Sequence, residues 1–180
     1  MLLEREHSQL LVIDIQEKLL PALHEPDAAI DRSAILMQAA HRLAIPVTIS
    51  EQYRKGLGPT DPRIEKFRGN APVFEKMHFS CADDAAIVGH MKSLLRKQMI
   101  ICGVETHVCV LQSALGFQKM GWDVAVVADA VTSRREASRD LALSRLRHAG
   151  VAVVNTEMAV FEWMNLAGTP EFKEISKLIK

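Results

Sequence analysis

The sequence has 180 residues, and its 22 basic and 22 acidic side chains give a formal net charge of +0. That length suits one domain with one buried core, and a balanced charge without a long basic run gives no support for nucleic-acid binding. No apolar stretch approaches the roughly 20 residues of a membrane helix, and cysteines without a Cys-x-x-Cys motif favour a reducing setting. We therefore expect a cytoplasmic, single-domain protein spanning residues 1–180, with no membrane or nucleic-acid partner.

Apolar runs alternate with helical patterns along the chain. We expect strands at residues 10–13, 47–50, 72–74, 99–102, 124–127 and 151–154. We expect helices at residues 26–44, 83–95, 106–120, 136–149, 158–164 and 171–179. Short, wholly apolar strands are typical of a sheet covered on both faces, and their alternation with helices indicates parallel strands. The sequence therefore predicts an α/β fold, a three-layer α/β/α domain with a six-stranded parallel sheet.

Residues 51–70 interrupt this alternation with glycines and prolines among charged side chains. A connection of this length is unusual in a compact domain, and such loops commonly form binding sites or lids. We predict that it forms the wall of a pocket, with Glu51, Gln52 and Tyr53 contacting the substrate. A mobile surface loop without a function is the alternative interpretation.

The stretch 99–110 combines a strand, a tight turn and a thiol. An apolar run reaches Gly103 and Val104, and Thr106 could then cap a helix whose third residue is Cys109. A helix N-terminus stabilises the thiolate, which is the nucleophilic form of cysteine. The alternative is that Cys109 is simply a small buried apolar side chain, as many free cysteines are.

Polar residues follow several of the expected strands: Asp14, Glu51, Lys76 and Cys109. Ligands of open parallel sheets bind beyond the carboxyl ends of the strands, so these side chains are expected to converge. There Lys76 could favour the thiolate, and Asp14 could take the thiol proton and later activate water, which predicts covalent hydrolysis through a thioester. Alternatively, Asp14 binds backbone amides in a loop and Lys76 faces solvent at the end of an edge strand.

Three motifs resemble those of the isochorismatase-like cysteine hydrolase superfamily, in the same order. They are Leu-Val-Ile-Asp-Ile-Gln at 11–16, Lys76, and Gly-Val-Glu-Thr-His-Val-Cys at 103–109. Residues 51–60 and 172–180 further resemble the branch called isochorismatase domain-containing proteins. The resemblance extends over nearly the whole chain.

This resemblance implies a six-stranded parallel sheet and a catalytic triad of Asp14, Lys76 and Cys109. It also implies a cis peptide between Val104 and Glu105, with the N–H groups of Glu105 and Cys109 forming an oxyanion hole. Members of the family commonly form dimers or larger homo-oligomers, so we expect the same here.

The sequence departs from the family pattern of nicotinamidases, which carry an Asp-x-His metal cluster after the second strand. Here that region reads Glu51-Gln52-Tyr53, and the next histidine is His78. We therefore expect neither a metal ion nor an organic cofactor. Isochorismatases proper cleave a vinyl ether without a nucleophilic cysteine, so the presence of Cys109 favours amide-type C–N hydrolysis of a small carbonyl compound.

Other functions fit the same residues. The chain could be an isochorismatase-type ether hydrolase, or a binding or regulatory protein that keeps the fold without turnover. It could also be a thiol redox sensor, with Cys81 close to Cys109 in space. We otherwise assign Cys81 and Cys102 to packing, and His78 and His107 to hydrogen-bonded structure rather than catalysis.

Overall fold

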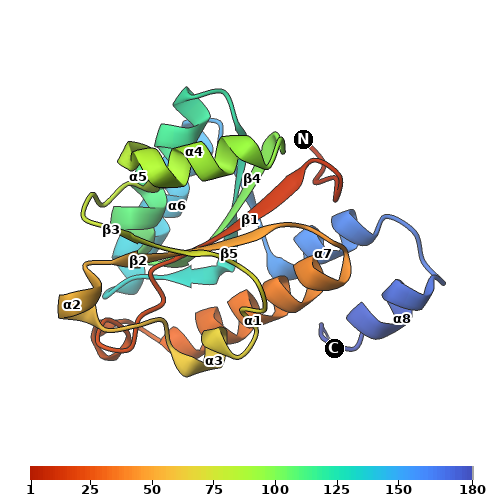
Figure 1. The fold of residues 1–180 in the computed structure, drawn as a ribbon, viewed down its shortest axis with the longest axis horizontal. Coiled ribbons are helices and arrows are strands. Elements are labelled where there is room, and N and C mark those ends of the chain that lie inside the picture. Colours follow the sequence, from red (N-terminus) through yellow and green to blue (C-terminus); the bar gives the residue numbers. More distant parts are fainter. Residues whose placement is uncertain (180) are drawn as a thin grey trace.

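The computed structural model describes residues 1–179 and contains one six-stranded sheet in the order β3-β2-β1-β4-β5-β6 (Figure 1). Every neighbouring pair of strands is parallel, which confirms the predicted α/β domain. The strands are β1 (Ser8–Ile13), β2 (Val47–Gln52), β3 (Val73–Lys76), β4 (Gln98–Val104), β5 (Asp123–Thr132) and β6 (Ala152–Val154).

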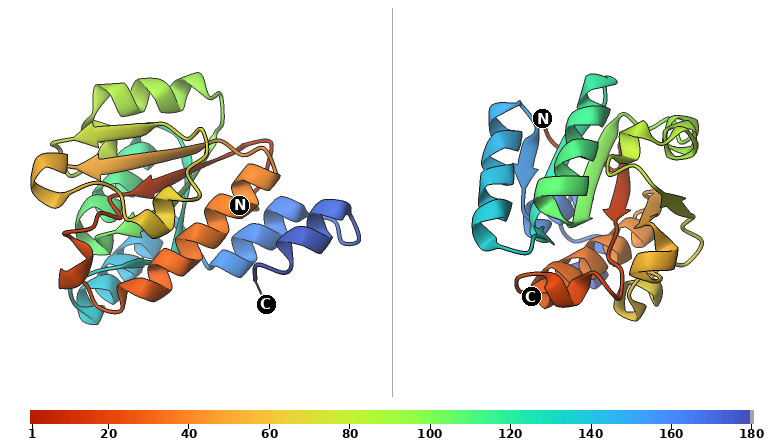
Figure 2. Two further views of the ribbon diagram at one scale, coloured as in Figure 1. Left: turned by 60° about the horizontal axis from the view of Figure 1, so that its bottom comes forward. Right: turned by 90° about the vertical axis from the view of Figure 1, so that its left-hand side faces the viewer.

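The helices cover both faces of the sheet. They are α1 (Pro26–Arg42), α2 (Arg54–Leu57), α3 (Pro62–Glu65), α4 (Ala85–Ser93), α5 (Leu111–Lys119), α6 (Glu136–His148), α7 (Thr156–Met164) and α8 (Pro170–Ile175). Shorter turns are η1 (Leu20–Ala22), η2 (Cys81–Asp83) and η3 (Thr106–Val110). Helices α4 and α5 lie on one side of the sheet and α1 on the other (Figure 1), while α7 and α8 lie beside α1 (Figure 2).

The buried apolar side chains form two cores, one on each face of the sheet. The alternation of side chains along β1 explains this division. Leu10 and Val12 join the core that α1 and α7 cover, whereas Leu11 and Ile13 join the core under α4, α5 and α6. Successive residues of a strand point to opposite faces, so an unbroken apolar run is the pattern that a sheet between two helical layers requires. No helix within residues 1–179 is long and apolar enough to cross a membrane.

Residues 51–70 contain regular secondary structure and do not form a single irregular loop. Strand β2 continues to Gln52 because it pairs with the end of β3, where Gln52 lies opposite Lys76. Helix α3 then starts at Pro62, and the Asp61 side chain accepts a hydrogen bond from the Arg63 N–H at 2.9 Å. An aspartate cap before a proline is a favourable helix start, and it explains why the prediction of one irregular connection was wrong.

Candidate active site

Asp14 and Lys76 form a buried ion pair at the carboxyl edge of the sheet. Asp14 directly follows β1 and Lys76 ends β3, and Lys76 Nζ lies 2.7 Å from Asp14 Oδ2. Both side chains are 0% exposed, so Lys76 does not face solvent, and the oxygens of Asp14 are bound by side chains rather than by backbone amides. A buried pair of charges is tolerated only when its remaining hydrogen-bonding groups are also satisfied.

The ammonium of Lys76 is fully satisfied. Besides Asp14 it donates to Gln52 Oε1 at 2.7 Å and to the Phe79 carbonyl at 3.1 Å, which uses all its N–H groups. Burial is the largest single effect on the pKa of Lys76 and lowers it, but the charge and hydrogen bond of Asp14, together with Cys81 and Cys109, outweigh burial and the net pKa is raised. Lys76 therefore stays charged at neutral pH and holds a permanent positive charge beside Asp14.

Gln52 was expected in a pocket wall, and the structure places its amide against the ammonium of Lys76. Its Nε2 donates to the Met77 carbonyl at 2.9 Å. Gln16 secures the backbone of Gln52 from the other side: its Oε1 accepts from Gln52 N at 2.7 Å, and its Nε2 donates to the carbonyls of Gln52 and Gly58. Gln16 was not predicted as a site residue, although a glutamine two residues after a strand-end acid was the available signal.

Ser50 holds the second oxygen of Asp14, and sequence reasoning also missed it. Its hydroxyl donates to Asp14 Oδ1 at 2.7 Å and accepts from the Cys81 thiol at 3.6 Å. Burial raises the pKa of Cys81 to about 11, so this thiol is protonated and acts as a donor. Cys81, which was assigned to packing, thus contacts the site through Ser50.

Cys109 lies in the π-helical turn η3 rather than in the first turn of an α-helix capped by Thr106. Glu105 is the residue before the turn, and its carbonyl accepts hydrogen bonds from both Val108 N and Val110 N. The bond from Val110 N to the Glu105 carbonyl widens the turn into a π-helical one, and no side chain caps the turn. The prediction of Thr106 as the cap was therefore wrong.

Gly103 lies in β4, shortly before the turn η3, and sets the spacing between β1 and β4 at this point. Its φ is +112°, and a β carbon there would lie 2.1 Å from the Ile13 carbonyl oxygen. Only glycine fits so close to the neighbouring backbone. Asp14 and the turn with Cys109 thus follow two strand ends whose backbones lie close together at Ile13 and Gly103.

The pKa of Cys109 shifts opposite to the expected direction. Burial raises it, the negative charge of Asp14 and hydrogen bonding to Asp14 raise it further, and Lys76 opposes these effects. The side chain is a thiol at neutral pH, and it becomes a nucleophile only when a neighbouring base takes its proton. Asp14 is the carboxylate whose charge acts on this thiol.

The remaining predicted residues have other surroundings. Glu51 accepts from Thr60 N at 2.7 Å and from Arg54 at 2.6 Å, so its carboxylate binds the loop that follows it. Tyr53 is 45% exposed, and His107 Nδ1 lies 3.0 Å from Ser133 Oγ. Cys102 is buried within β4, and burial raises its pKa to about 12. The peptide between Val104 and Glu105 is cis.

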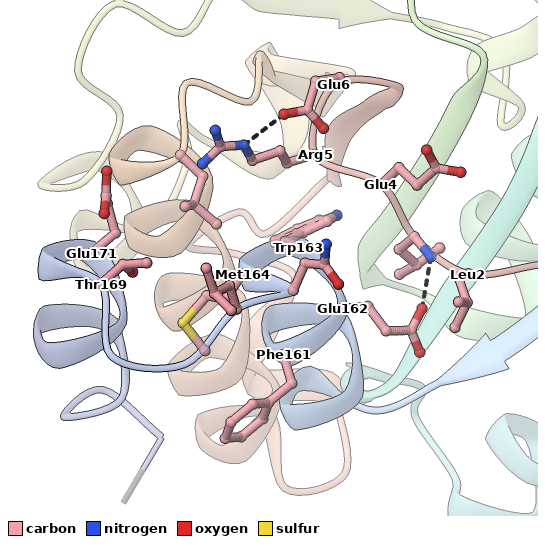
Figure 3. A pocket seen from close by; sticks show the side chains of 14 residues that line it. Leu2, Glu4, Arg5, Glu6, Phe161, Glu162, Trp163, Met164, Thr169 and Glu171 are labelled. Atoms are coloured by element: carbon pink, nitrogen blue, oxygen red, sulfur yellow. Dashed lines mark hydrogen bonds and ion pairs between the residues drawn. The ribbon is translucent and has the colours of Figure 1, made fainter.

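Within residues 1–179, no group of three or more histidine, cysteine, aspartate or glutamate side chains could hold a metal ion. A cavity of about 800 Å³ lies elsewhere, between the N-terminal segment and α7, and is lined by Leu2, Arg5 and Trp163 among others (Figure 3). Because this segment precedes β1, the cavity lies near the amino edge of the sheet. The ion pair lies at the opposite edge.

Comparison with known proteins finds relatives that match nearly the whole length of this chain. The model of the isochorismatase domain matches residues 8–158. The secreted isochorismatase effector Isc1 of Phytophthora sojae is 40% identical over 178 residues, 96% of this chain and 84% of the relative. Isochorismatase domain-containing protein 2 of Danio rerio is 38% identical over 178 residues, 98% of this chain and 89% of the relative.

Solved structures agree with this assignment. A protein described as the MAR1 ribonuclease of Caenorhabditis elegans is 34% identical, with a TM-score of 0.93 over 99% of this chain and 92% of that chain. YcaC of Pseudomonas aeruginosa, solved with hexane-2,5-diol and covalent acrylamide, is 26% identical, with a TM-score of 0.92 over 98% and 91%. YcaC of Escherichia coli, described as an octameric hydrolase of unknown specificity, is 26% identical, with a TM-score of 0.92 over 99% and 90%.

Proposed function

This chain belongs to the isochorismatase family, and we propose that it is a hydrolase that cleaves a C–N bond of a small carbonyl compound through a thioester on Cys109. The observation that carries the proposal is the buried pair of Asp14 and Lys76, joined at 2.7 Å. Their charges act on the Cys109 thiol, which supports Asp14 as the base and Cys109 as the nucleophile.

In the first half of the reaction Cys109 Sγ attacks the carbonyl carbon while its proton passes to Asp14. Lys76 stabilises the charge of Asp14 before the transfer, and the N–H groups of Glu105 and Cys109 bind the oxyanion that forms. The C–N bond then breaks as the nitrogen takes the proton from Asp14. The products of this half are an amine or ammonia and a thioester.

In the second half a water molecule attacks the thioester and gives its proton to Asp14. The C–S bond breaks, a carboxylic acid is released, and the sulfur recovers its proton. Each half uses Asp14 once as a base and once as an acid, and neither requires a metal ion or an organic cofactor.

Two assays test this proposal. A panel of small amides is incubated with the protein and with Cys109→Ser, and release of ammonia or amine is measured; we expect release only from the wild type. Acrylamide, which is covalently attached in the Pseudomonas neighbour, should modify Cys109 in mass spectra of the intact protein. Release of ammonia or amine that persists in Cys109→Ser would contradict the thioester on Cys109, and absence of both turnover and modification would favour a binding protein.

The redox-sensor alternative receives less support. Such a sensor needs an accessible thiol with thiolate character, whereas Cys81 is fully buried and burial raises its pKa to about 11. The ribonuclease description of the worm neighbour implies a polyanionic substrate, and the net charge of +0 does not favour one.

We further propose a cytoplasmic homo-oligomer. The E. coli neighbour, which is described as octameric, supports the proposed assembly. The Phytophthora relative is described as secreted, which differs from the location proposed here. Light scattering during size-exclusion chromatography measures the mass of the assembly directly, and a mass near 20.0 kDa would contradict an oligomer.

A further inference from the structure

The cavity between the N-terminal segment and α7 plays no part in the proposed hydrolysis. Its volume of about 800 Å³ lies in the range of sites for small organic ligands, roughly 300–1,000 Å³. The N-terminal segment, the C-terminal half of α7 and the start of α8 form its walls (Figure 3). Leu3 N donates to Glu162 Oε2 at 2.7 Å, so a hydrogen bond joins two of these walls.

The apolar part of the lining is aromatic and aliphatic, and much of it is exposed. Trp163 Nε1 donates to Ser8 Oγ at 3.0 Å, so the one polar atom of the indole is already bonded within the protein. Phe161, Leu2 and Leu166 are 44%, 71% and 66% exposed. Single exposed apolar side chains are ordinary, but these three line the same cavity. A ligand with an apolar body would remove this surface from water.

The charged part of the lining is mainly acidic. It consists of one guanidinium and four carboxylates, those of Arg5, Glu4, Glu6, Glu162 and Glu171. Arg5 is paired with Glu6 at 2.7 Å, and Glu4 lies 3.8 Å from the His7 ring. Among the residues that the structure describes, no basic side chain forms an ion pair with Glu162 or Glu171. Two carboxylates of the cavity are therefore available to a cation.

The end of α7 adds to this negative potential. The C-terminus of a helix carries a partial negative charge, which basic side chains in the last turn offset. Each of α1, α4, α5 and α6 has at least one basic residue in its last turn, whereas α7 has none and carries Glu162 there. Glu162 is half-buried, so its charge is less well solvated than that of a surface glutamate. A cation beside Glu162 would stabilise both charges.

An organic cation matches both parts of the lining. Carboxylates pair with ammonium groups, and aromatic rings attract cations and pack against apolar carbon. We propose that this cavity binds a small organic cation, with an ammonium group beside Glu162 and an apolar body against Phe161 and Trp163. Glu171 adds to the attraction from the α8 side. The site lies at the sheet edge opposite the ion pair of the candidate active site, so it is a second ligand site and does not depend on the proposed function.

Three ligands of similar shape test the role of charge. At neutral pH, 4-phenylbutylammonium is positive, 4-phenylbutan-1-ol is neutral and 4-phenylbutyrate is negative. Fluorescence in Trp122→Phe reports on Trp163 alone, and isothermal titration calorimetry repeats the series with the unsubstituted protein. We expect the ammonium to bind at least about 10-fold more tightly than the alcohol, as for a charge-assisted hydrogen bond, and the carboxylate to bind most weakly. Added salt should weaken the ammonium selectively.

Variants locate the preference for the cation. Glu162→Gln keeps an acceptor for Leu3 N but removes the charge, so the affinity for the ammonium should fall about 10-fold while that for the alcohol stays the same. Glu171→Gln should lower the ammonium affinity a few-fold, because this residue is exposed.

Glu157→Gln is the matched control. It removes the same charge from the first turn of α7, away from the cavity lining, and should keep the full preference. Phe161→Ala should weaken the ammonium and the alcohol equally, because both present the same apolar body. Thermal unfolding monitored by circular dichroism checks that each variant is folded, and Glu171→Gln decides the result if Glu162→Gln is not.

Four outcomes would overturn the inference. Absence of ammonium binding at about 10 mM would show that the cavity does not hold such a ligand. Equal affinities for the three ligands would exclude recognition of charge. Equal losses in Glu157→Gln and Glu162→Gln would assign the preference to the overall charge of the chain. A fall in molecular mass by light scattering when the ammonium is added would show that a second copy of the chain occupies the cavity.

Discussion

Two groups of buried polar side chains lie at the same edge of the sheet, and they differ in how completely they are bonded. Around Asp14 and Lys76 both carboxylate oxygens and every ammonium hydrogen have protein partners. At Glu105 and Thr106 one oxygen of each side chain has none. Complete bonding fixes the groups proposed to move protons, whereas incomplete bonding leaves the cost of buried polar atoms without partners.

The largest expected effect comes from disrupting the fully hydrogen-bonded group of Asp14 and Lys76. Lys76→Met leaves Asp14 buried and unpaired, which should lower the free energy of unfolding by about 3–5 kcal/mol and abolish hydrolysis. The double variant Asp14→Leu/Lys76→Met, which leaves no unpaired charge, should be more stable than Lys76→Met alone. Urea unfolding measures both, and purely additive losses would contradict the pairing.

The next effect separates thiol reactivity from turnover. Asp14 raises the pKa of Cys109, so Asp14→Asn should lower that pKa and speed alkylation by iodoacetamide at pH 8 by about 10-fold, or one pKa unit. Hydrolysis should be lost in the same variant because the base is gone. Alkylation is followed from pH 6 to 10, with Cys109→Ser as the control for other thiols. Slower alkylation in Asp14→Asn would show that Asp14 activates the resting thiol.

A smaller effect tests Ser50 as a positioning residue. Ser50→Ala removes the donor to Asp14 Oδ1 and should lower kcat about 10-fold with little change in KM, because the base is then less firmly oriented. Ser50→Thr restores the hydroxyl and should recover most of the loss. Cys81→Ala removes only the weaker 3.6 Å contact to Ser50 and is the matched control. Equal losses in both alanine variants would point to packing instead.

The smallest expected effect is on the free energy of unfolding, when a side chain of the incompletely hydrogen-bonded group, Glu105 and Thr106, is changed. Thr106→Val deletes a buried hydroxyl that has no partner, so the free energy of unfolding should stay constant or rise by up to about 1 kcal/mol. Ser50→Ala deletes a bonded hydroxyl and should lower it by about 1–3 kcal/mol. Differential scanning calorimetry of the two variants compares them directly, and a clear loss in Thr106→Val would reveal a partner for its hydroxyl.

The fold was predictable because apolar runs such as residues 99–102 reveal strands buried on both faces. The same reasoning placed Asp14 and Lys76 together, since polar residues at the ends of parallel strands meet at one edge. These inferences need only local patterns and one rule of topology.

Other features depend on contacts between distant segments. Ser50 and Gln16 act through partners 36 residues away, so their neighbours in sequence give little sign of the role. The π-helical turn differs from an α-helix only in which N–H groups the Glu105 carbonyl binds, and threonine before a helical pattern predicts an ordinary cap. The direction of the Cys109 pKa shift likewise depends on burial and on the geometry of Asp14.

Gly103 limits the sequence changes that the site can accept during evolution. The proposed base and nucleophile follow Ile13 and Gly103, whose backbones meet where a β carbon would lie only 2.1 Å from the Ile13 oxygen. Any other residue would force the two strand ends apart, and a misplacement of about 1 Å between reacting groups can lower a rate by about 10²-fold. Mutational drift can therefore replace many core side chains with others of similar volume, but at Gly103 it has no alternative, because a hydrogen atom in place of a side chain keeps the base and the thiol within reach.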